Sequence, residues 1–390
     1  MGMTKDLLKK NTMLIALIAA MVLFQVLILL NNKGSLFAPT NITNLISQNS
    51  YVVILATGML LCILTGGNID LSVGSGVALV SAVAGLLAVN MKVNSYLVIL
   101  ICLVLGVAMG AAQAYWIAYM RIPPFIVTLA GMLTFRGVAW LILQGKTISP
   151  FPADFTRLFN SYLPGGSAKA ITPTVSVIVA VAICAIMILL EVFSRAQKKR
   201  KGYETDKVAF VAVRVVLVCA AVLFVFYLLG QDKGIPVVLI LLAAVVLAYR
   251  YYTENTVPGR HLYAMGGNEK ATRLSGINTD HTLFFAYTNM GLLVAVAALV
   301  CVSRFNSAAP SAGNNYELDA IGACFIGGAS AYGGVGTVGG AAIGAVFMGV
   351  LNNGMSILGI DQNWQRTVKG LVLLAAVVFD VVSKKRKQSA

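Results

Sequence analysis

Few side chains in this sequence have the types and spacing that catalysis or metal binding requires. The six cysteines form no CxxC pair, the two histidines lack metal-ligand spacing, and no catalytic triad or pair of carboxylates in a soluble cleft occurs. The pattern GxxxxGK[ST] is also absent, so the chain has no P-loop for ATP. We therefore expect no catalytic residue, no metal site and no cofactor in this chain. The cysteines lie in or beside apolar runs, where thiols behave as small buried hydrophobic groups.

The most polar interruption in the first third of the chain is the segment 66–75, GGNIDLSVGS. Its glycine pair lets the backbone turn sharply. Asp70 either caps the next helix by accepting unpaired N–H groups or belongs to a polar element on the path of a hydroxylated solute. Residues 63–75 (ILTGGNIDLSVGS) are echoed by residues 325–337 (FIGGASAYGGVGT). Such paired interruptions indicate either a transport path between two related halves or two ordinary tight turns.

Neutral polar groups within apolar runs hydrogen-bond either a sugar or a neighbouring helix. Together with the polar segment, the candidates for a translocation path or gate are Asn68, Asp70, Ser72, Gln113, Asn289, Asn352 and Asn353. Aromatic faces such as those of Trp116, Trp140 and Trp364 would also suit a sugar path. Of two arginines within apolar runs, Arg214 is close enough to the end of its run to snorkel, whereas Arg136 is harder to explain in that way.

The composition requires membrane-spanning helices to hold these residues. Of the 390 residues, 58% are hydrophobic and 11% are charged, whereas a soluble domain carries about 25% charged residues. A span needs about 20 apolar residues, and the predicted spans are 12–31, 45–66, 70–90, 96–118, 124–144, 172–194, 208–229, 235–252, 282–303, 317–330, 335–357 and 364–382. The run 317–330 is too short for a straight crossing and is expected to be a half-helix or a re-entrant segment. The predicted fold is all-α, a polytopic transmembrane bundle of about 12 segments.

Charge and glycine patterns add topology and packing to this picture. With the N-terminus inside, the inner segments hold 18 Lys and Arg residues and the outer segments hold 7. The positive-inside rule therefore predicts that both termini are cytoplasmic, and the net charge of +15 reflects topology rather than nucleic-acid binding. The outer stretch 145–171, rich in Pro and Gly, is expected to form a cap. Glycines four residues apart, Gly106 with Gly110 and Gly336 with Gly340 and Gly344, favour either close helix packing or a channel lining.

The longest inner loop, 253–281, contains a short predicted helix over 268–274. Asn268 fits its N-cap and Gly276 fits its stop. A short amphipathic helix on the inner surface either docks into the groove of a partner or binds lipid headgroups.

Four runs carry a resemblance to a known family: LTGGNIDLSVGS (64–75), PPFIVTLAGMLTFRG (123–137), GRHLYAMGGNEKATRLSGI (259–277) and NYELDAIGACFIGGASAYGGVGTVGGAAIGA (315–345). They resemble the membrane-spanning permease subunits of ABC-type monosaccharide importers, in the same order, and the resemblance covers about 45–382. The additional length around 172–235 is most similar to the longer xylose and multiple-sugar subgroup.

The resemblance implies one transmembrane permease domain over 1–390, divided into N-terminal helices (12–171), extra helices with a basic loop (172–235), a cytoplasmic coupling loop (253–281) and C-terminal helices (282–382). It implies a multi-pass protein of the bacterial cytoplasmic (inner) membrane, surrounded by lipid, that moves xylose or a related pentose or hexose by alternating access.

The resemblance also implies partners. These are a second permease copy in a homodimer, a cytoplasmic ABC ATPase with two nucleotide-binding halves that holds the ATP and Mg, and an extracytoplasmic sugar-binding protein. The residues that would contact the ATPase are Gly259, Arg260, Gly267, Asn268, Ala271 and Gly276.

The alternative function is an ion-coupled secondary sugar transporter. It needs a carboxylate well inside a span, and Asp70, Glu191 and Asp380 all lie near the ends of predicted spans. A glycine-rich channel or a scaffold subunit is a third interpretation.

Overall fold

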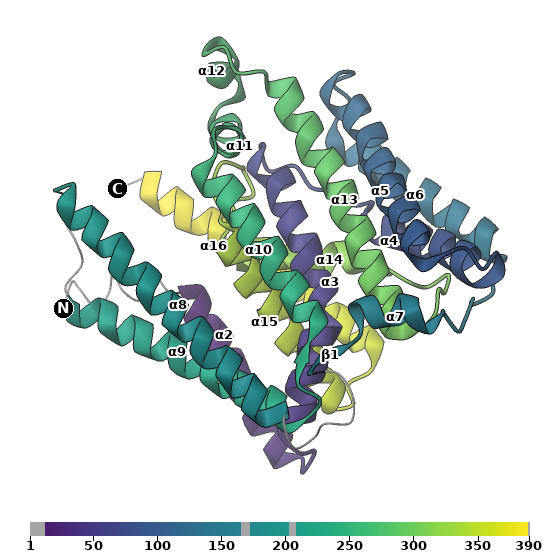
Figure 1. Ribbon diagram of the computed structural model, residues 1–390. Coiled ribbons are helices and arrows are strands. Elements are labelled where there is room, and N and C mark those ends of the chain that lie inside the picture. Colours follow the sequence, from purple (N-terminus) through teal and green to yellow (C-terminus); the bar gives the residue numbers. More distant parts are fainter. Residues whose placement is uncertain (1–11, 165–171, 203–207, 389–390) are drawn as a thin grey trace.

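Long helices form nearly all of the computed structural model, which describes residues 12–164, 172–202 and 208–388 (Figure 1). The elements of the first half are α2 Thr12–Leu30, α3 Pro39–Leu64, α4 Val73–Gly85, the π-helix η1 Leu86–Asn90, α5 Ser95–Ala118, α6 Pro124–Leu143, α7 Ala153–Phe159 and β1 Tyr162–Leu163. Those of the second half are α8 Thr172–Arg200, α9 Val208–Gln231, β2 Ile235–Pro236, α10 Val237–Asn255, α11 Val257–Gly267, α12 Glu269–Leu274, α13 Thr279–Phe305, α14 Tyr316–Ile326, α15 Val338–Ile357 and α16 Gln362–Gln388. The two short strands pair antiparallel, with Tyr162 opposite Pro236.

The predicted all-α membrane fold is confirmed. Ten of the described helices are long and apolar enough to cross a membrane, and they correspond to ten of the predicted spans. The other two predicted spans, 317–330 and 364–382, correspond to α14 and α16. With 11 residues, α14 rises only about 16 Å and is too short to cross the bilayer alone, as the sequence predicts. The number of full crossings and the side of each terminus stay predictions.

Several predicted boundaries were wrong, because hydropathy follows the apolar residues of a segment, whereas helices begin and end at capping and turn residues. The predicted span 45–66 belongs to a helix that already begins at Pro39, where proline suits the first turn because its missing N–H has no partner there. Conversely, α4 begins at Val73 and not at residue 70. Helix α8 continues past the predicted end at residue 194 to Arg200.

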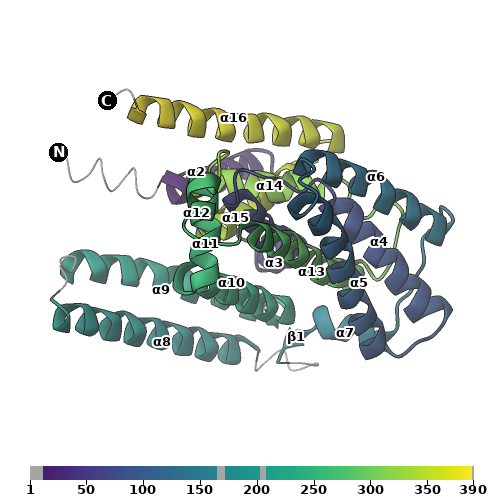
Figure 2. The same cartoon turned by 90° about the horizontal axis from the view of Figure 1, so that it is seen from above.

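The core of the bundle consists of α3, α4, α13, α14 and α15, with α5 packed along α13. In the apolar window of α3, 83% of the residues are buried, which is the highest share among the candidate spans. The hairpin of α8 and α9 lies along one edge of the bundle, and α16 lies along the opposite edge (Figure 2). Within the described residues, α16 packs mainly against α14. The predicted extra helices of 172–235 therefore lie at the periphery.

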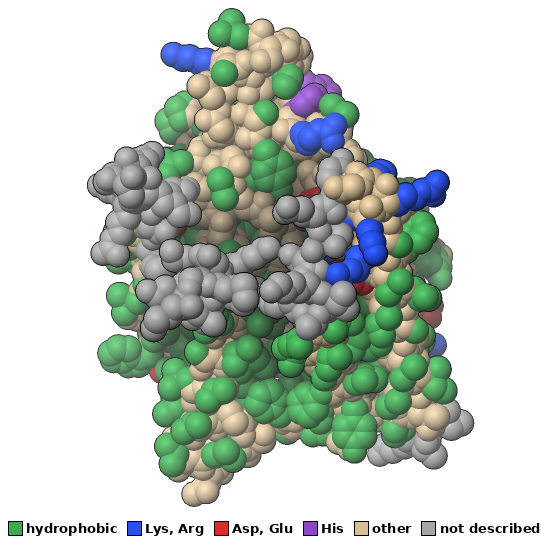
Figure 3. Space-filling model, turned by 90° about the vertical axis from the view of Figure 1, so that its left-hand side faces the viewer, with side chains coloured by type: hydrophobic (Ala, Val, Ile, Leu, Met, Phe, Trp, Pro, Cys, Tyr) green, Lys and Arg blue, Asp and Glu red, His purple; other side chains and the backbone are tan. Residues whose placement is uncertain are grey.

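The short helices α11 and α12 stand at the end of the bundle that is uppermost in Figure 1, which we call the α12 end. The face shown in Figure 3 has Lys, Arg and His side chains in its upper part and mainly hydrophobic side chains in its lower part. At the opposite end, α7 and the two strands form a cap together with the bridge between Ile148 and Ala308. Part of the predicted cap, 165–171, lies outside the described residues. All six cysteines are free thiols, and five of them are buried.

Candidate functional site

The predicted inner helix exists as α12, and its ends are built as the sequence indicates. The Asn268 side chain accepts a hydrogen bond from Ala271 N at 2.9 Å and is the N-cap. Gly276 follows the helix with φ +85°, a left-handed conformation that glycine adopts without strain. Within such a short helix these caps decide where the segment starts and stops, since isolated helices of this length are marginal.

Five of the six predicted coupling residues lie on the surface at the α12 end. Arg260, Gly267, Asn268, Ala271 and Gly276 are exposed. The sixth, Gly259, is buried, and a Cβ there would lie 2.8 Å from Thr253 Cα. Gly259 therefore permits the close approach of α11 to the end of α10 and is not available to a partner.

The most exposed large apolar side chain of this surface is Leu274, at the end of α12. It is 90% exposed, more than any other large hydrophobic side chain described. Lys270 and Arg273 on the same short helix are also exposed. An apolar tip flanked by basic groups is a suitable shape for insertion into a groove of another protein or into a lipid headgroup layer.

The two glycine-rich interruptions of the sequence meet directly beneath α11. A Cβ on Gly67 would lie 2.9 Å from the Ala331 carbonyl carbon, and a Cβ on Gly333 would lie 2.6 Å from Gly66 N. Gly334 N donates to the Leu64 carbonyl at 3.1 Å. The end of α3 and the turn before α15 are therefore in backbone contact, which only residues without side chains allow.

Helix α11 rests on this junction. A Cβ on Gly266 would lie 2.8 Å from Gly334 Cα, and the Tyr263 hydroxyl donates to the Gly336 carbonyl at 3.0 Å. Burial raises the pKa of the Tyr263 phenol, so it remains a donor over the physiological range. A displacement of α11 would therefore also move the two glycine-rich interruptions.

Three of the predicted path residues form one polar cluster in the bundle interior. Asp70 Oδ1 accepts from Ser72 N at 2.8 Å and from Ser72 Oγ at 2.7 Å. Gln113 Nε2, from α5, donates to Ser72 Oγ at 2.8 Å. These side chains line a small cavity together with Gly76, Met109, Gly110, Phe135, Gly291 and Val294. Of the two interpretations of Asp70, the cap on the first turn of α4 was wrong, because the carboxylate accepts hydrogen bonds from Ser72, one residue before the helix, and the helix has no side-chain cap.

The other four predicted path residues lie elsewhere. Asn68 donates to Thr65 Oγ1 at 3.3 Å in the turn after α3. Asn289 accepts from the Tyr249 hydroxyl at 2.5 Å, and Asn353 exchanges two hydrogen bonds of 2.9 Å with Asn41. Within the described residues, Asn289 Nδ2 and Asn352 Oδ1 are buried without a hydrogen-bond partner. Such unpaired atoms are rare in native interiors.

The aromatic candidates for a sugar path do not line the interior. Trp116, Trp140 and Trp364 are 49%, 50% and 67% exposed on the surface of the bundle. Arg136 holds the α13–α14 loop, since its Nη1 donates to the carbonyls of Pro310 at 3.1 Å and Ala312 at 2.6 Å.

Sequence reasoning missed a buried ion pair between α14 and α16. Lys369 Nζ lies 2.9 Å from Asp319 Oδ1, and the side chains are 16% and 2% exposed. The Tyr51 hydroxyl of α3 donates to Asp319 Oδ2 at 2.6 Å. Lys369 and Asp319 are charged residues inside apolar runs. An acid and a base in two C-terminal spans could therefore have indicated this ion pair from the sequence.

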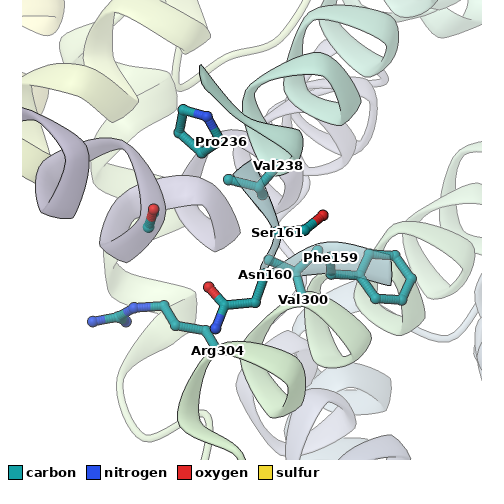
Figure 4. Close-up of a pocket in the computed structure, with 8 residues that line it drawn as sticks. Phe159, Asn160, Ser161, Pro236, Val238, Val300 and Arg304 are labelled. Atoms are coloured by element: carbon teal, nitrogen blue, oxygen red, sulfur yellow. The ribbon is translucent and has the colours of Figure 1, made fainter. Parts of the chain in front are cut away.

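A small pocket at the end opposite α12 was also not foreseen. It lies where Arg304 at the end of α13 meets Asn160 and Ser161 next to β1, close to Pro236 of β2 (Figure 4). None of the predicted site residues lines it.

These features, many apolar helices around buried polar clusters and an exposed short helix at one end, define a multi-pass membrane protein. Comparison with protein families gives a match to "Branched-chain amino acid transport system / permease component" over residues 41–377. The chain belongs to this permease family.

Individual relatives cover nearly the whole chain. The chain is 39% identical to the xylose transport system permease protein XylH of Escherichia coli strain K12, over 96% of this chain and 93% of that protein. It is 37% identical to XylH of Haemophilus influenzae, over 96% of each. It is 34% identical to the ribose import permease protein RbsC of Escherichia coli strain K12, over 97% of this chain and 95% of that protein. No solved structure matches the chain.

Proposed function

We propose that this chain is the permease subunit of an ATP-driven ABC importer in the bacterial inner membrane and that it moves xylose or a related pentose or hexose. The observation that carries the proposal is the similarity to XylH and RbsC along nearly the full length. A separate ABC ATPase holds ATP and Mg, a second permease copy completes the pore, and an extracytoplasmic sugar-binding protein delivers the sugar.

In this proposal α12 is the contact with the ATPase. Its exposed tip, Leu274, inserts into the partner, and α11 passes the displacement to the two interruptions through Gly266 and Tyr263. Only contacts that differ between two states can shift their populations. Backbone contacts without intervening side chains transmit a displacement directly, because no flexible group absorbs it.

The sugar path follows from the interior polar groups. The cluster of Asp70, Ser72 and Gln113 offers hydroxyl, amide and carboxylate groups to a hydroxylated solute. The unpaired atoms of Asn289 and Asn352 are further sites that a sugar hydroxyl would satisfy.

Transport in proteoliposomes tests the proposal. The chain is reconstituted with the ATPase and the sugar-binding protein of its own organism, and uptake of labelled xylose and ribose is measured. We expect uptake that requires both ATP and the binding protein. Uptake by the chain alone, driven by a proton or sodium gradient, would show an ion-coupled transporter instead.

A matched pair of cap variants tests the role of α12. Asn268→Ala removes the cap of α12, and we expect uptake to fall severalfold while the protein stays folded, since one cap is worth about 1 kcal/mol. Asn94 is also an asparagine N-cap, for α5 at the opposite end of the bundle, and its side chain accepts from Tyr96 N, two residues on, at 2.9 Å. Asn94→Ala should therefore leave uptake nearly unchanged. Equal losses in both variants would contradict the coupling role.

A further inference from the structure

One arginine joins three elements at the α12 end. Arg121 lies in the turn between α5 and α6, and its Nη1 is 2.7 Å from Glu269 Oε1 in the first turn of α12. Its Nη2 pairs with Asp280 Oδ1 in the first turn of α13. Arg273, from the last turn of α12, lies 3.7 Å from the same aspartate. The ends of α5, α12 and α13 are thus bridged by a single guanidinium group.

The backbone around Arg121 attaches it firmly to α5. Met120 N and Ile122 N donate to the carbonyls of Tyr115 and Trp116, at 3.3 and 3.1 Å, in the last turns of that helix. Arg121 itself has φ +56°, a left-handed conformation that is uncommon for residues other than glycine. The backbone at Arg121 is therefore held against the last turns of α5, so that a force on this side chain acts on α5.

Helices α5 and α13 pack closely along each other, because glycines bring their backbones together. A Cβ on Gly110 would lie 2.6 Å from the Tyr287 carbonyl oxygen, and a Cβ on Gly106 would lie 2.5 Å from the Gly291 carbonyl oxygen. Both helices also line the cavity that holds Ser72 and Gln113. Movement of this pair would change the polar cluster directly.

We propose that Arg121 is a positioning residue that transmits the displacement of α12 to the α5–α13 pair and so to the interior cavity. The inference rests on the proposed coupling of this chain to an ATPase. Along the chain, α12 is joined to α13 only through residues 275–278, which include Gly276 at φ +85°. This linker joins α12 to α13 alone, and the bridge through Arg121 connects α12 to the end of α5 as well.

The exposure of the three charged side chains in the bridge indicates that the bridge contributes little to folding stability. The side chains of Arg121, Glu269 and Asp280 are 40%, 43% and 26% exposed. Ion pairs at such positions contribute little to the folding free energy, because water screens them. Loss of the bridge should therefore leave the protein folded while α12 moves independently of α5.

The experiment uses the complete importer in proteoliposomes and measures sugar uptake and ATP hydrolysis in the same samples. The variants are Arg121→Gln, Arg121→Lys and, as the matched control, Arg250→Gln. Arg250 pairs with Glu254 within the single helix α10, at 3.2 Å, so its loss disconnects no elements. Hydrogen exchange of residues 268–276 in the purified permease alone gives a second readout, which needs no partner and no sugar.

We expect Arg121→Gln to lower the sugar moved per ATP hydrolysed by at least about fivefold, the lower range of coupling between linked sites. ATP hydrolysis should continue, exchange in α12 should rise, and Arg121→Lys should restore part of the ratio. Arg250→Gln should change neither quantity. An unchanged ratio in Arg121→Gln, in an importer whose wild type is driven by ATP, would overturn the inference.

The two proposals fail in different ways. If the wild-type importer shows no ATP-driven uptake, the proposed function fails, whatever the variants do. If wild-type uptake is normal and exchange in α12 is the same with and without Arg121, the bridge does not hold α12 and this inference alone fails.

Discussion

The α5–α13 pair and the α8–α9 hairpin are both pairs of long apolar helices, yet they occupy contrasting places in the molecule. In the apolar windows of α5 and α13, 39% and 72% of the residues are buried, compared with 17% and 6% in α8 and α9. The hairpin is the more apolar of the two pairs. Hydropathy therefore does not decide which helices are central, because lipid accommodates apolar side chains as well as protein does.

Small residues hold both helix pairs together, and the helices around each pair make the difference between the two regions. In the α5–α13 pair both helices contribute glycine, so backbone meets backbone. In α8 the buried positions are also small and recur every four residues, namely Thr172, Ser176, Ala180 and Cys184. Its remaining faces carry bulky exposed side chains such as Leu189 and Phe193. Helix α9 also contributes a glycine, since a Cβ on Gly230 would lie 2.8 Å from Pro173 Cα. The α5–α13 pair lies in the core because α3 and α4 also pack against α13, whereas α8 packs mainly against α9.

The largest expected effect comes from filling the α5–α13 contact. Gly291→Leu would place a Cβ 2.7 Å from Gly110 Cα. Backbone atoms cannot relieve such a clash by changing rotamer, as a side chain could. We expect a loss of folding free energy beyond the usual cost of about 1–3 kcal/mol for an overpacked core, and hence little folded protein. The yield of monodisperse protein in detergent measures how much of the variant folds.

The control for this prediction is Gly137→Leu in α6, where no atom lies within 4 Å of the added Cβ. Its yield should equal that of the wild type. Normal yield of Gly291→Leu would show that the two helices are not locked together.

The next largest effect concerns α16, a peripheral helix that is held by charge. Lys369→Ala leaves the buried Asp319 carboxylate without its cation, and breaking a buried pair in this way costs about 3–5 kcal/mol. The double variant Asp319→Asn with Lys369→Gln should recover most of that loss, because no unpaired charge remains. Unfolding in mixed micelles at increasing denaturant measures the stability of the single and of the double variant. Equal stability of Lys369→Ala and wild type would mean that α16 is held by apolar packing alone.

The smallest effects compare one leucine in the core with one in the hairpin. Leu61 in α3 is fully buried, whereas Leu217 in α9 is 66% exposed. Leu61→Ala should cost about 2–5 kcal/mol through the cavity that it leaves. Leu217→Ala should stay within about 0.5 kcal/mol, as is usual for surface positions. The difference between their midpoints of thermal unfolding checks the comparison, and similar midpoints would contradict the peripheral placement of the hairpin.

The sequence predicted the existence and type of most elements but not which of them touch. The short helix after Asn268, its stop at Gly276 and the incomplete span 317–330 follow from local capping and from length. Clustering of Asp70, Ser72 and Gln113 required knowledge of which helices are neighbours. The contact between the two glycine-rich interruptions was not predictable for the same reason, although their likeness was visible in the sequence.

Arg121 and Lys369 show most clearly which contacts the sequence could not predict. Arg121 occurs in the sequence as an isolated basic residue at a loop, and Lys369 follows Arg366 within an apolar run. Their meaning depends on the acids that face them, Glu269 and Asp280 in the first case and Asp319 in the second. Those acids lie far along the chain, and no local spacing rule connects them.

The amino-acid sequence by itself determined that this protein lies in a membrane, roughly where most of its long helices run and which short segment caps itself at the surface. These properties are local, since they depend on apolar length, on charge and on hydrogen bonds between residues a few positions apart. Only the tertiary structure decided which helices form the core, which glycines meet and which charges pair. Contact with lipid stabilises apolar residues about as much as contact with each other. Which helices become neighbours therefore depends on how closely their surfaces fit, and that fit is a property of two helices together.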